Sequence, residues 1–161
     1  MIDKDLLQHT VEASIEGTDL FLVDITVSSD NDINVEVDSP TAVDIDECAE
    51  ITRNIEAVFD RDEEDYSLTV GSAGITSPLK IRAQFVKYLN KDLEVLTRDG
   101  RKLHGVLVEV GHGTPGDRDV DFTVEVLTKV KEEGQKKPVL RSMPVKLTSG
   151  ECKYVRYDLK F

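Results

Sequence analysis

Three glycines have a spacing that could serve phosphate binding. Gly111, Gly113 and Gly116 satisfy the pattern G-x-G-x-x-G, and they follow an apolar stretch that is typical of a strand. A dinucleotide-binding loop of this kind must open a helix, because the helix N-terminus receives the pyrophosphate. Here the alternating residues 120–126 predict a second strand instead. We therefore interpret the glycine segment as a flexible hairpin loop and expect no nucleotide cofactor.

An acidic run could hold a calcium ion. Residues 60–65 read Asp-Arg-Asp-Glu-Glu-Asp, like the start of a calcium-binding loop. An EF-hand loop needs glycine at its sixth position and glutamate at its twelfth, and this chain has Asp65 and Gly71 there. The run therefore predicts a solvated acidic surface. The residues of this surface that could contact a basic partner are Asp60, Asp62, Glu63 and Glu64.

The other reactive side chains do not form a catalytic pattern. His9, His104 and His112 are far apart in the sequence, and none has a cysteine or carboxylate at a metal-ligand spacing. No nucleophile elbow or P-loop selects a serine or a lysine. We expect no metal, no cofactor and no catalytic residue. A small hydrolase site assembled from distant residues is kept as an alternative.

Basic residues cluster in one predicted hairpin. Six of them fall within 18 residues around the loop Glu132-Glu133-Gly134-Gln135. Lysine ammonium groups bind phosphates as point charges, so the cluster predicts contact with an RNA backbone or a ribonucleoprotein surface. The two glutamates weaken its field, and an ordinary charged hairpin is the alternative. No aromatic residue interleaves, which argues against base stacking. The cluster comprises Lys129, Lys131, Lys136, Lys137, Arg141 and Lys146.

Charge divides the chain into two halves. Residues 1–83 hold 20 acidic and 5 basic side chains, for a net charge of −15. Residues 84–161 hold 12 acidic and 15 basic side chains, for a net charge of +3. This asymmetry predicts two domains with different partners. An acidic surface that only aids solubility is the alternative for the first half. The net charge of the whole chain of 161 residues, −12, describes neither half. It therefore does not exclude an RNA partner for the second half.

Composition limits the class of protein. Hydrophobic residues make up 39%, enough for a core, and no run reaches the ~18 apolar residues of a membrane span. The acidic start, residues 1–5, is unlike a signal peptide. The two cysteines, Cys48 and Cys152, cannot form a disulfide framework and suit a reducing compartment. We expect a cytoplasmic monomer without membrane contact.

Hydrophobic periodicity predicts an α-β-β-α-β domain over residues 1–82. Leu7, Val11 and Ile15 recur at helical spacing, and Asp44 with Glu47 resembles a capping box that opens a second helix. Both helices should cover one face of the sheet. The predicted elements are a helix at 3–16, strands at 19–28 and 33–38, a helix at 44–59 and a strand at 66–70.

The remaining residues, 83–161, predict a small all-β domain. An ordered linker at 71–82 and a short helical turn at 83–91 precede the strands, and Asp99-Gly100 signals a hairpin turn. Five short strands in so few residues favour an SH3-like or Sm-like barrel. These strands are predicted at 93–96, 103–110, 120–126, 139–147 and 154–161.

One segment carries a family signature. Residues 66–79 read Tyr-Ser-Leu-Thr-Val-Gly-Ser-Ala-Gly-Ile-Thr-Ser-Pro-Leu. They resemble the signature of the bacterial ribosome maturation factor RimP family, Tyr-x-Leu-Glu-Val-Ser-Ser-Pro-Gly-Leu-Asp-Arg-Pro-Leu. Residues 46–55 are similar to the helix that precedes it in the family. Thr76 and Ser77 replace the signature's Asp and Arg. The matching residues, placed at the interdomain joint, are Tyr66, Leu68, Val70, Ser72, Gly74, Pro78 and Leu79.

The resemblance implies an α+β domain followed by an SH3-like barrel. It also implies a non-enzymatic factor that binds the free small (30S) ribosomal subunit late in its maturation, near the decoding centre. The implied partners are that subunit, the small-subunit ribosomal protein at the decoding centre, and ribosomal RNA. With the charge asymmetry, we expect the acidic half to meet protein and the basic hairpin to meet RNA. Two alternatives are kept. In the first, the barrel holds the ribosomal protein, which reverses this assignment of partners; in the second, the chain is a generic RNA-binding adaptor.

Overall fold

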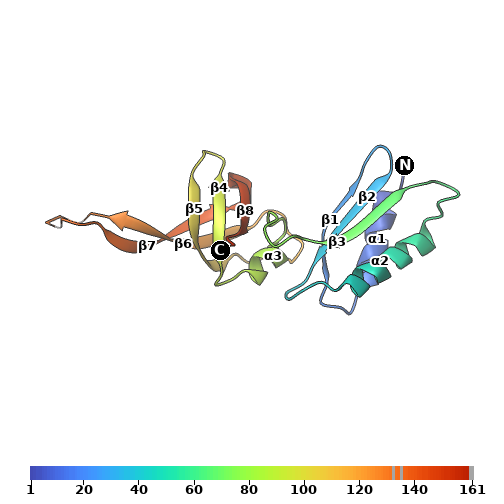
Figure 1. Ribbon diagram of the computed structural model, residues 1–161, viewed down its shortest axis with the longest axis horizontal. Coiled ribbons are helices and arrows are strands. Elements are labelled where there is room, and N and C mark those ends of the chain that lie inside the picture. The colour runs from blue at the N-terminus through green and yellow to red at the C-terminus, as the bar shows by residue number, and fades with distance from the viewer. Residues whose placement is uncertain (132, 135, 160–161) are drawn as a thin grey trace. The chain divides into compact units, whose positions relative to one another are not determined.

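The computed structural model describes residues 1–131, 133–134 and 136–159. The chain forms two compact units, Met1–Gly74 and Ile75–Phe161. Together they contain helices and two separate sheets (Figure 1), which confirms the predicted α+β class. The predicted division into independent domains at residues 82 and 83 stays a prediction. No helix able to span a membrane occurs among the residues described.

The first unit follows the predicted order α-β-β-α-β. Its helices begin where the sequence supplies caps. The Asp3 carboxylate accepts hydrogen bonds from the first turn of α1, and Asp44 with Glu47 forms a complete capping box on α2. Capping carboxylates satisfy backbone N–H groups that have no partner within the helix. The elements are α1 (Lys4–Ile15), β1 (Phe21–Val27), β2 (Asp32–Asp38), α2 (Ile45–Val58) and β3 (Ser67–Ser72).

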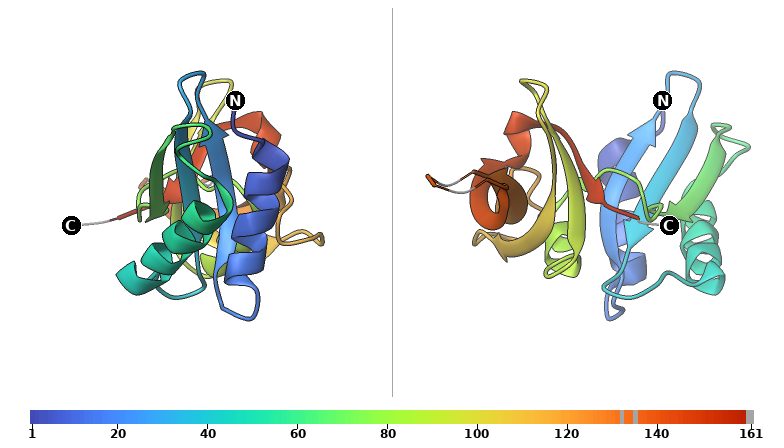
Figure 2. Two further views of the ribbon diagram at one scale, coloured as in Figure 1. Left: turned by 90° about the vertical axis from the view of Figure 1, so that its right-hand side faces the viewer. Right: turned by 60° about the vertical axis from the view of Figure 1, so that its left-hand side comes forward.

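The sheet of the first unit has the order β1-β2-β3. Strands β1 and β2 form the predicted antiparallel hairpin, whereas β3 runs parallel to β2. The parallel pairing follows from α2, which carries the chain back across the sheet before β3 begins. Figure 2 shows both helices on one face of the sheet. The core between them contains Leu7, Val11, Val35, Ile51 and Ile55, all almost completely buried.

The second unit contains one short helix and five strands in the order β7-β6-β5-β4-β8, all antiparallel. The five predicted strands and the helical turn are present, although the last strand runs over Cys152–Tyr157 and not to residue 161 as predicted; residues 160 and 161 lie outside the described residues. Within the described residues, however, no strand pairing joins β7 to β8, so the sheet is not a closed barrel. The elements are α3 (Arg82–Lys87), β4 (Asp92–Thr97), β5 (Lys102–Val110), β6 (Asp121–Val130), β7 (Val139–Thr148), the 3-10 turn η1 (Ser149–Glu151) and β8 (Cys152–Tyr157).

Helix α3 packs on the core of this second unit. Phe85 is fully buried and meets Phe122, with 5.1 Å between the ring centroids. Leu93, Leu107 and Val124 complete the same apolar cluster. Alternation places these side chains on one face of each strand. The opposite face of β4, β5 and β8 is therefore available for polar side chains.

The glycine loop is more firmly held than expected for a flexible loop. The backbone N–H of Arg82 donates to the Asp117 carbonyl at 2.8 Å, and that of Ala83 donates to the Pro115 carbonyl at 2.9 Å. The Arg82 side chain also donates from Nε to the Gly111 carbonyl at 2.7 Å. These bonds fix the loop to the start of α3. It connects two strands, as predicted, and it opens no helix.

Candidate functional site

The structure brings five of the six clustered basic residues to one end of the β6–β7 hairpin. Thr128 pairs with Arg141, and Lys129 pairs with Leu140. The other three lysines lie in the connection between the strands. Lys146 is separated from them, since it pairs with Thr123 at the other end of the hairpin. The five residues at the end, all exposed, are Lys129, Lys131, Lys136, Lys137 and Arg141.

The strand register explains why this end of the hairpin is accessible. Strand β5 pairs with β6 over residues 122–126, whereas β7 pairs with β6 over the whole of 121–130. Residues 127–130 and 139–142 therefore form a two-stranded extension, which we call the ribbon. Figure 1 shows it projecting beyond the other strands of its sheet. No core lies beneath a two-stranded ribbon, so both of its faces can meet a partner.

The acidic run forms a turn in which Glu64 is held by an ion pair. Glu64 lies 2.5 Å from the Met1 ammonium and accepts a hydrogen bond from Asn31 at 3.2 Å. The hydrogen bond from the ammonium group lowers the pKa of Glu64. Asp60 accepts from the backbone of Asp62 at 2.9 Å. Of the four acidic residues singled out in the sequence, Asp60, Asp62 and Glu63 are exposed and Glu64 is half-buried; the neighbouring Asp65 is exposed as well.

Replacement of Asn31 is expected to destabilise the first unit, because this residue joins three segments. It has a φ of 59° and accepts a hydrogen bond from the Ile2 backbone N–H at 3.2 Å. It also donates to Glu64 and to the Asp65 carbonyl. We expect Asn31→Ala to cost about 2 kcal/mol and Asn31→Gly about 1 kcal/mol, since glycine tolerates the positive φ. Urea unfolding would measure both, and equal losses would contradict the backbone contribution.

The family-signature residues divide between the two units. Tyr66 is buried, and its hydroxyl donates to the Phe59 carbonyl at 2.9 Å. Leu68 and Val70 pack against the first core, whereas Leu79 packs against the second. Ser72, Gly74 and Pro78 are exposed in the same stretch. The boundary after Gly74 thus falls within the signature. A role of this segment as the interdomain joint stays a prediction.

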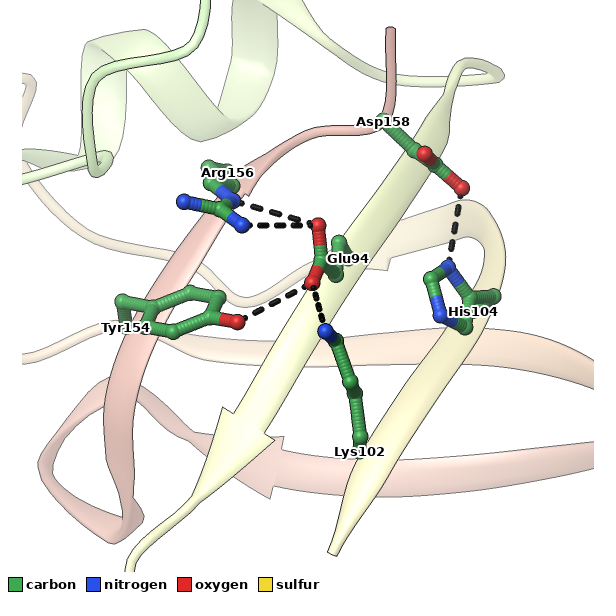
Figure 3. Close-up of polar contacts among 6 residues, drawn as sticks. All are labelled: Glu94, Lys102, His104, Tyr154, Arg156 and Asp158. Carbon is green, nitrogen blue, oxygen red and sulfur yellow. Dashed lines mark hydrogen bonds and ion pairs between the residues drawn. The ribbon is translucent and has the colours of Figure 1, made fainter. Parts of the chain in front are cut away.

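A charged cluster on the second unit escaped the sequence analysis. Glu94 lies on β4 and is only 8% exposed. Its Oε1 accepts hydrogen bonds from the Tyr154 hydroxyl at 3.0 Å and lies 2.9 Å from Lys102 Nζ. Its Oε2 accepts from Nε and Nη2 of Arg156, each at 3.1 Å (Figure 3). One carboxylate therefore joins β4 to both neighbouring strands.

These contacts control the ionisation of Glu94. The hydrogen bond from Lys102 makes the largest contribution, and those from Tyr154 and Arg156 add to it. Burial acts in the opposite direction, but the donors outweigh it and lower the pKa of Glu94 from 4.5 to about 2. Hydrogen bonds to the charged form favour that form. The Glu94 side chain is therefore a carboxylate at neutral pH.

Two cations stand on this face in fixed positions. Lys102 and Arg156 remain partly exposed around Glu94, and the Arg156 guanidinium lies 4.4 Å from the centroid of the Tyr154 ring. Beside them, His104 Nδ1 lies 3.0 Å from the Asp158 carboxylate. Such an array can bind anions or acidic side chains. Among the described residues, no group of three or more His, Cys, Asp or Glu side chains could hold a metal ion.

No sequence signal links these residues. Alternation along β4 indicates that Glu94 shares a face with Asp92 and Leu96. Its partners Tyr154 and Arg156 lie 60 and 62 residues further along the chain. Only the pairing of β4 with β8, in which Glu94 lies opposite Arg156, brings them together.

Comparison with known proteins identifies the family. The RimP N-terminal domain model matches residues 10–76. The Ribosome maturation factor RimP of Porphyromonas gingivalis is 37% identical over 147 residues, which cover 90% of this chain and 92% of that protein. The protein of the same name from Flavobacterium psychrophilum is 32% identical over 126 residues, covering 78% and 77%. The chain therefore belongs to the ribosome maturation factor RimP family.

Proposed function

We propose that this chain is a non-enzymatic assembly factor of the bacterial ribosome. It binds the free small (30S) subunit in the cytoplasm and assists late maturation near the decoding centre. Support comes from relatives that carry the name ribosome maturation factor and align with most of the chain. The surfaces described above suit binding, since they present exposed charged side chains.

Charge segregation is the observation on which the proposal rests. The unit Met1–Gly74 holds 20 acidic and 3 basic side chains, for a net charge of −17. The unit Ile75–Phe161 holds 12 acidic and 17 basic side chains, for a net charge of +5. An assembling subunit offers both basic proteins and RNA phosphates. Complementary potentials steer each unit towards a different one of these partners.

The proposal assigns partners to the two units. The acidic unit contacts the basic ribosomal protein of the decoding centre, using Asp60, Asp62 and Glu63, while Glu64 holds their turn in place. The second unit is an incompletely closed SH3-like barrel whose ribbon contacts ribosomal RNA. We treat 1–82 and 83–161 as separate domains, so that the two contacts can form in turn. The chain acts as a monomer.

Fractionation of a cell lysate on a sucrose gradient tests this function. We expect the tagged full chain to sediment with free small subunits, and to be absent from complete ribosomes. Raising the salt concentration from 50 to 200 mM should release it, because both proposed contacts are electrostatic. A chain that stays at the top of the gradient, or that follows complete ribosomes, would contradict the proposal.

A generic RNA-binding adaptor is the second candidate, and the exposed cations of the ribbon favour it. An adaptor would bind purified ribosomal RNA as tightly as it binds the subunit, with a steep dependence on salt. An assembly factor should prefer the 30S particle, where protein and RNA are both present. Filter binding with both targets under one buffer would separate the two functions.

A further inference from the structure

The ribbon carries exposed apolar side chains among its cations. Leu127 is 66% exposed and Leu140 is 60% exposed, although both lie in regular strands. Neither supports a core, because the ribbon extends past the part of β6 that β5 covers. Single exposed apolar residues are common on protein surfaces, but apolar side chains that gather in one exposed patch mark contact surfaces. A purely electrostatic contact with phosphates would not require them.

Alternation along the strands places these leucines on one face. Lys129 lies directly opposite Leu140, and Leu127 lies opposite Ser142. Paired residues, and residues two apart on a strand, point to the same side. This face of the ribbon therefore holds Leu127, Leu140 and Lys129 together. Arg141 lies on the other face of the ribbon, and Lys131, Lys136 and Lys137 lie in the connection between its strands.

The net charge of the hairpin end indicates which kind of partner binds the ribbon. Residues 127–143 hold five basic and two acidic side chains, a net charge of +3, within a chain whose net charge is −12. A polyanion therefore complements the ribbon better than a second copy of this acidic chain does. The minor groove of duplex RNA is wide and shallow, and phosphates line both of its edges. A two-stranded ribbon, with strands about 5 Å apart, fits such a groove.

We propose that the ribbon docks in the minor groove of duplex RNA. Its ammonium and guanidinium groups contact the phosphates, while Leu127 and Leu140 cover sugar and base-edge surface at the groove floor. The inference deepens the proposed function, on which it rests, by naming the form of RNA and the second kind of contact. It predicts an affinity with a salt-dependent part and a salt-independent part.

The test uses the full chain with a 20-base-pair RNA duplex and a DNA duplex of the same sequence. We expect the RNA duplex to bind at least about tenfold tighter, because the B-form minor groove is about half as wide as the major groove and excludes the ribbon. The B-form major groove does admit a two-stranded ribbon, so DNA binding of similar strength would indicate major-groove docking and contradict the inference. The double variant Leu127→Ser with Leu140→Ser should weaken RNA binding about tenfold and leave the salt slope unchanged. The triple variant Lys129→Gln, Lys136→Gln and Lys137→Gln should reduce the slope by about 2 to 3.

Leu6→Ser provides the matched control, since Leu6 is 45% exposed on α1 of the acidic unit. It should not change RNA binding, and circular dichroism should show that all variants fold. Equal affinity for RNA and DNA, or no effect of the leucine variant, would overturn the inference. So would self-association that depends on the leucines, or loss of 30S binding with intact duplex binding. Failure of the proposed function differs, because the wild-type chain would then not sediment with small subunits at all.

Discussion

Replacing Gly105 by alanine is expected to lower the stability of the second unit by about 3 kcal/mol or more. Gly105 lies on β5 opposite Val126, at the centre of the five-stranded sheet. An added Cβ would lie 2.4 Å from the carbonyl oxygen of Glu125 and 2.9 Å from its carbonyl carbon. Both atoms belong to the backbone of β6, which neighbours hold on both sides. Urea unfolding followed by circular dichroism would measure the loss.

Gly116→Ala is the matched control for this prediction. No heavy atom of the described residues outside its immediate neighbours lies within 4 Å of the position that its Cβ would occupy. Its substitution should change the free energy of unfolding by less than about 0.5 kcal/mol. If Gly105→Ala changed the free energy of unfolding as little as Gly116→Ala does, the inferred close contact between β5 and β6 at this point would be contradicted. A loss of similar size in both variants would point to a general effect of glycine replacement.

Replacing Glu94 by glutamine should cost about 2 kcal/mol. The amide keeps the shape of the carboxylate but loses its charge and turns one acceptor into a donor. At the Oε2 position that donor would face two Arg156 nitrogens, and at the Oε1 position it would face Lys102. Both partners only donate, so one or two of the four contacts of Glu94 would be lost. Thermal unfolding would measure the effect. Glu109→Gln, at an exposed glutamate on β5, is the control and should leave the stability nearly unchanged.

The contribution of Glu94 should also depend on pH in a defined direction. Its pKa is about 2 in the folded chain against an ordinary value of 4.5. A lowered folded pKa means that the stabilisation is complete above pH 4.5 and is lost as the pH falls towards 2. The stability difference between the wild-type chain and Glu94→Gln should therefore shrink over this range. A difference that stayed constant down to pH 2 would show that charge is not its source.

Local patterns in the sequence were sufficient for most elements. The helical spacing of Leu7, Val11 and Ile15 and the caps at Asp3 and Asp44 predicted both helices of the first unit. Alternation predicted the strands, and Asp99-Gly100 predicted the turn between β4 and β5, where Gly100 has a φ of 92°. These signals involve neighbours within about four residues. They can therefore be recognised in the sequence without knowledge of the rest of the fold.

The basic cluster was predictable for the same reason, because its residues lie on one hairpin. The accessibility of the cluster to a partner could not be predicted in this way. That property depends on β5 ending its pairing at Val126 while β7 continues alongside β6. The acidic run was also visible, but the engagement of Glu64 by Met1 and Asn31 requires the chain terminus to lie beside the turn. Neither register nor the position of a terminus is encoded locally.

Sequence alone determined the order of the elements, the charge asymmetry and the family signature, since each depends on residue type and short-range spacing. Tertiary structure alone decided the parallel pairing of β3, the joining of Glu94 to Arg156, and the projection of the ribbon. The physical reason is that strand pairing over long separations is selected by the burial of whole faces together, and one residue of slippage would reverse every side chain. Strand pairing and register are therefore determined by the folded sheet as a whole and cannot be read from any single segment.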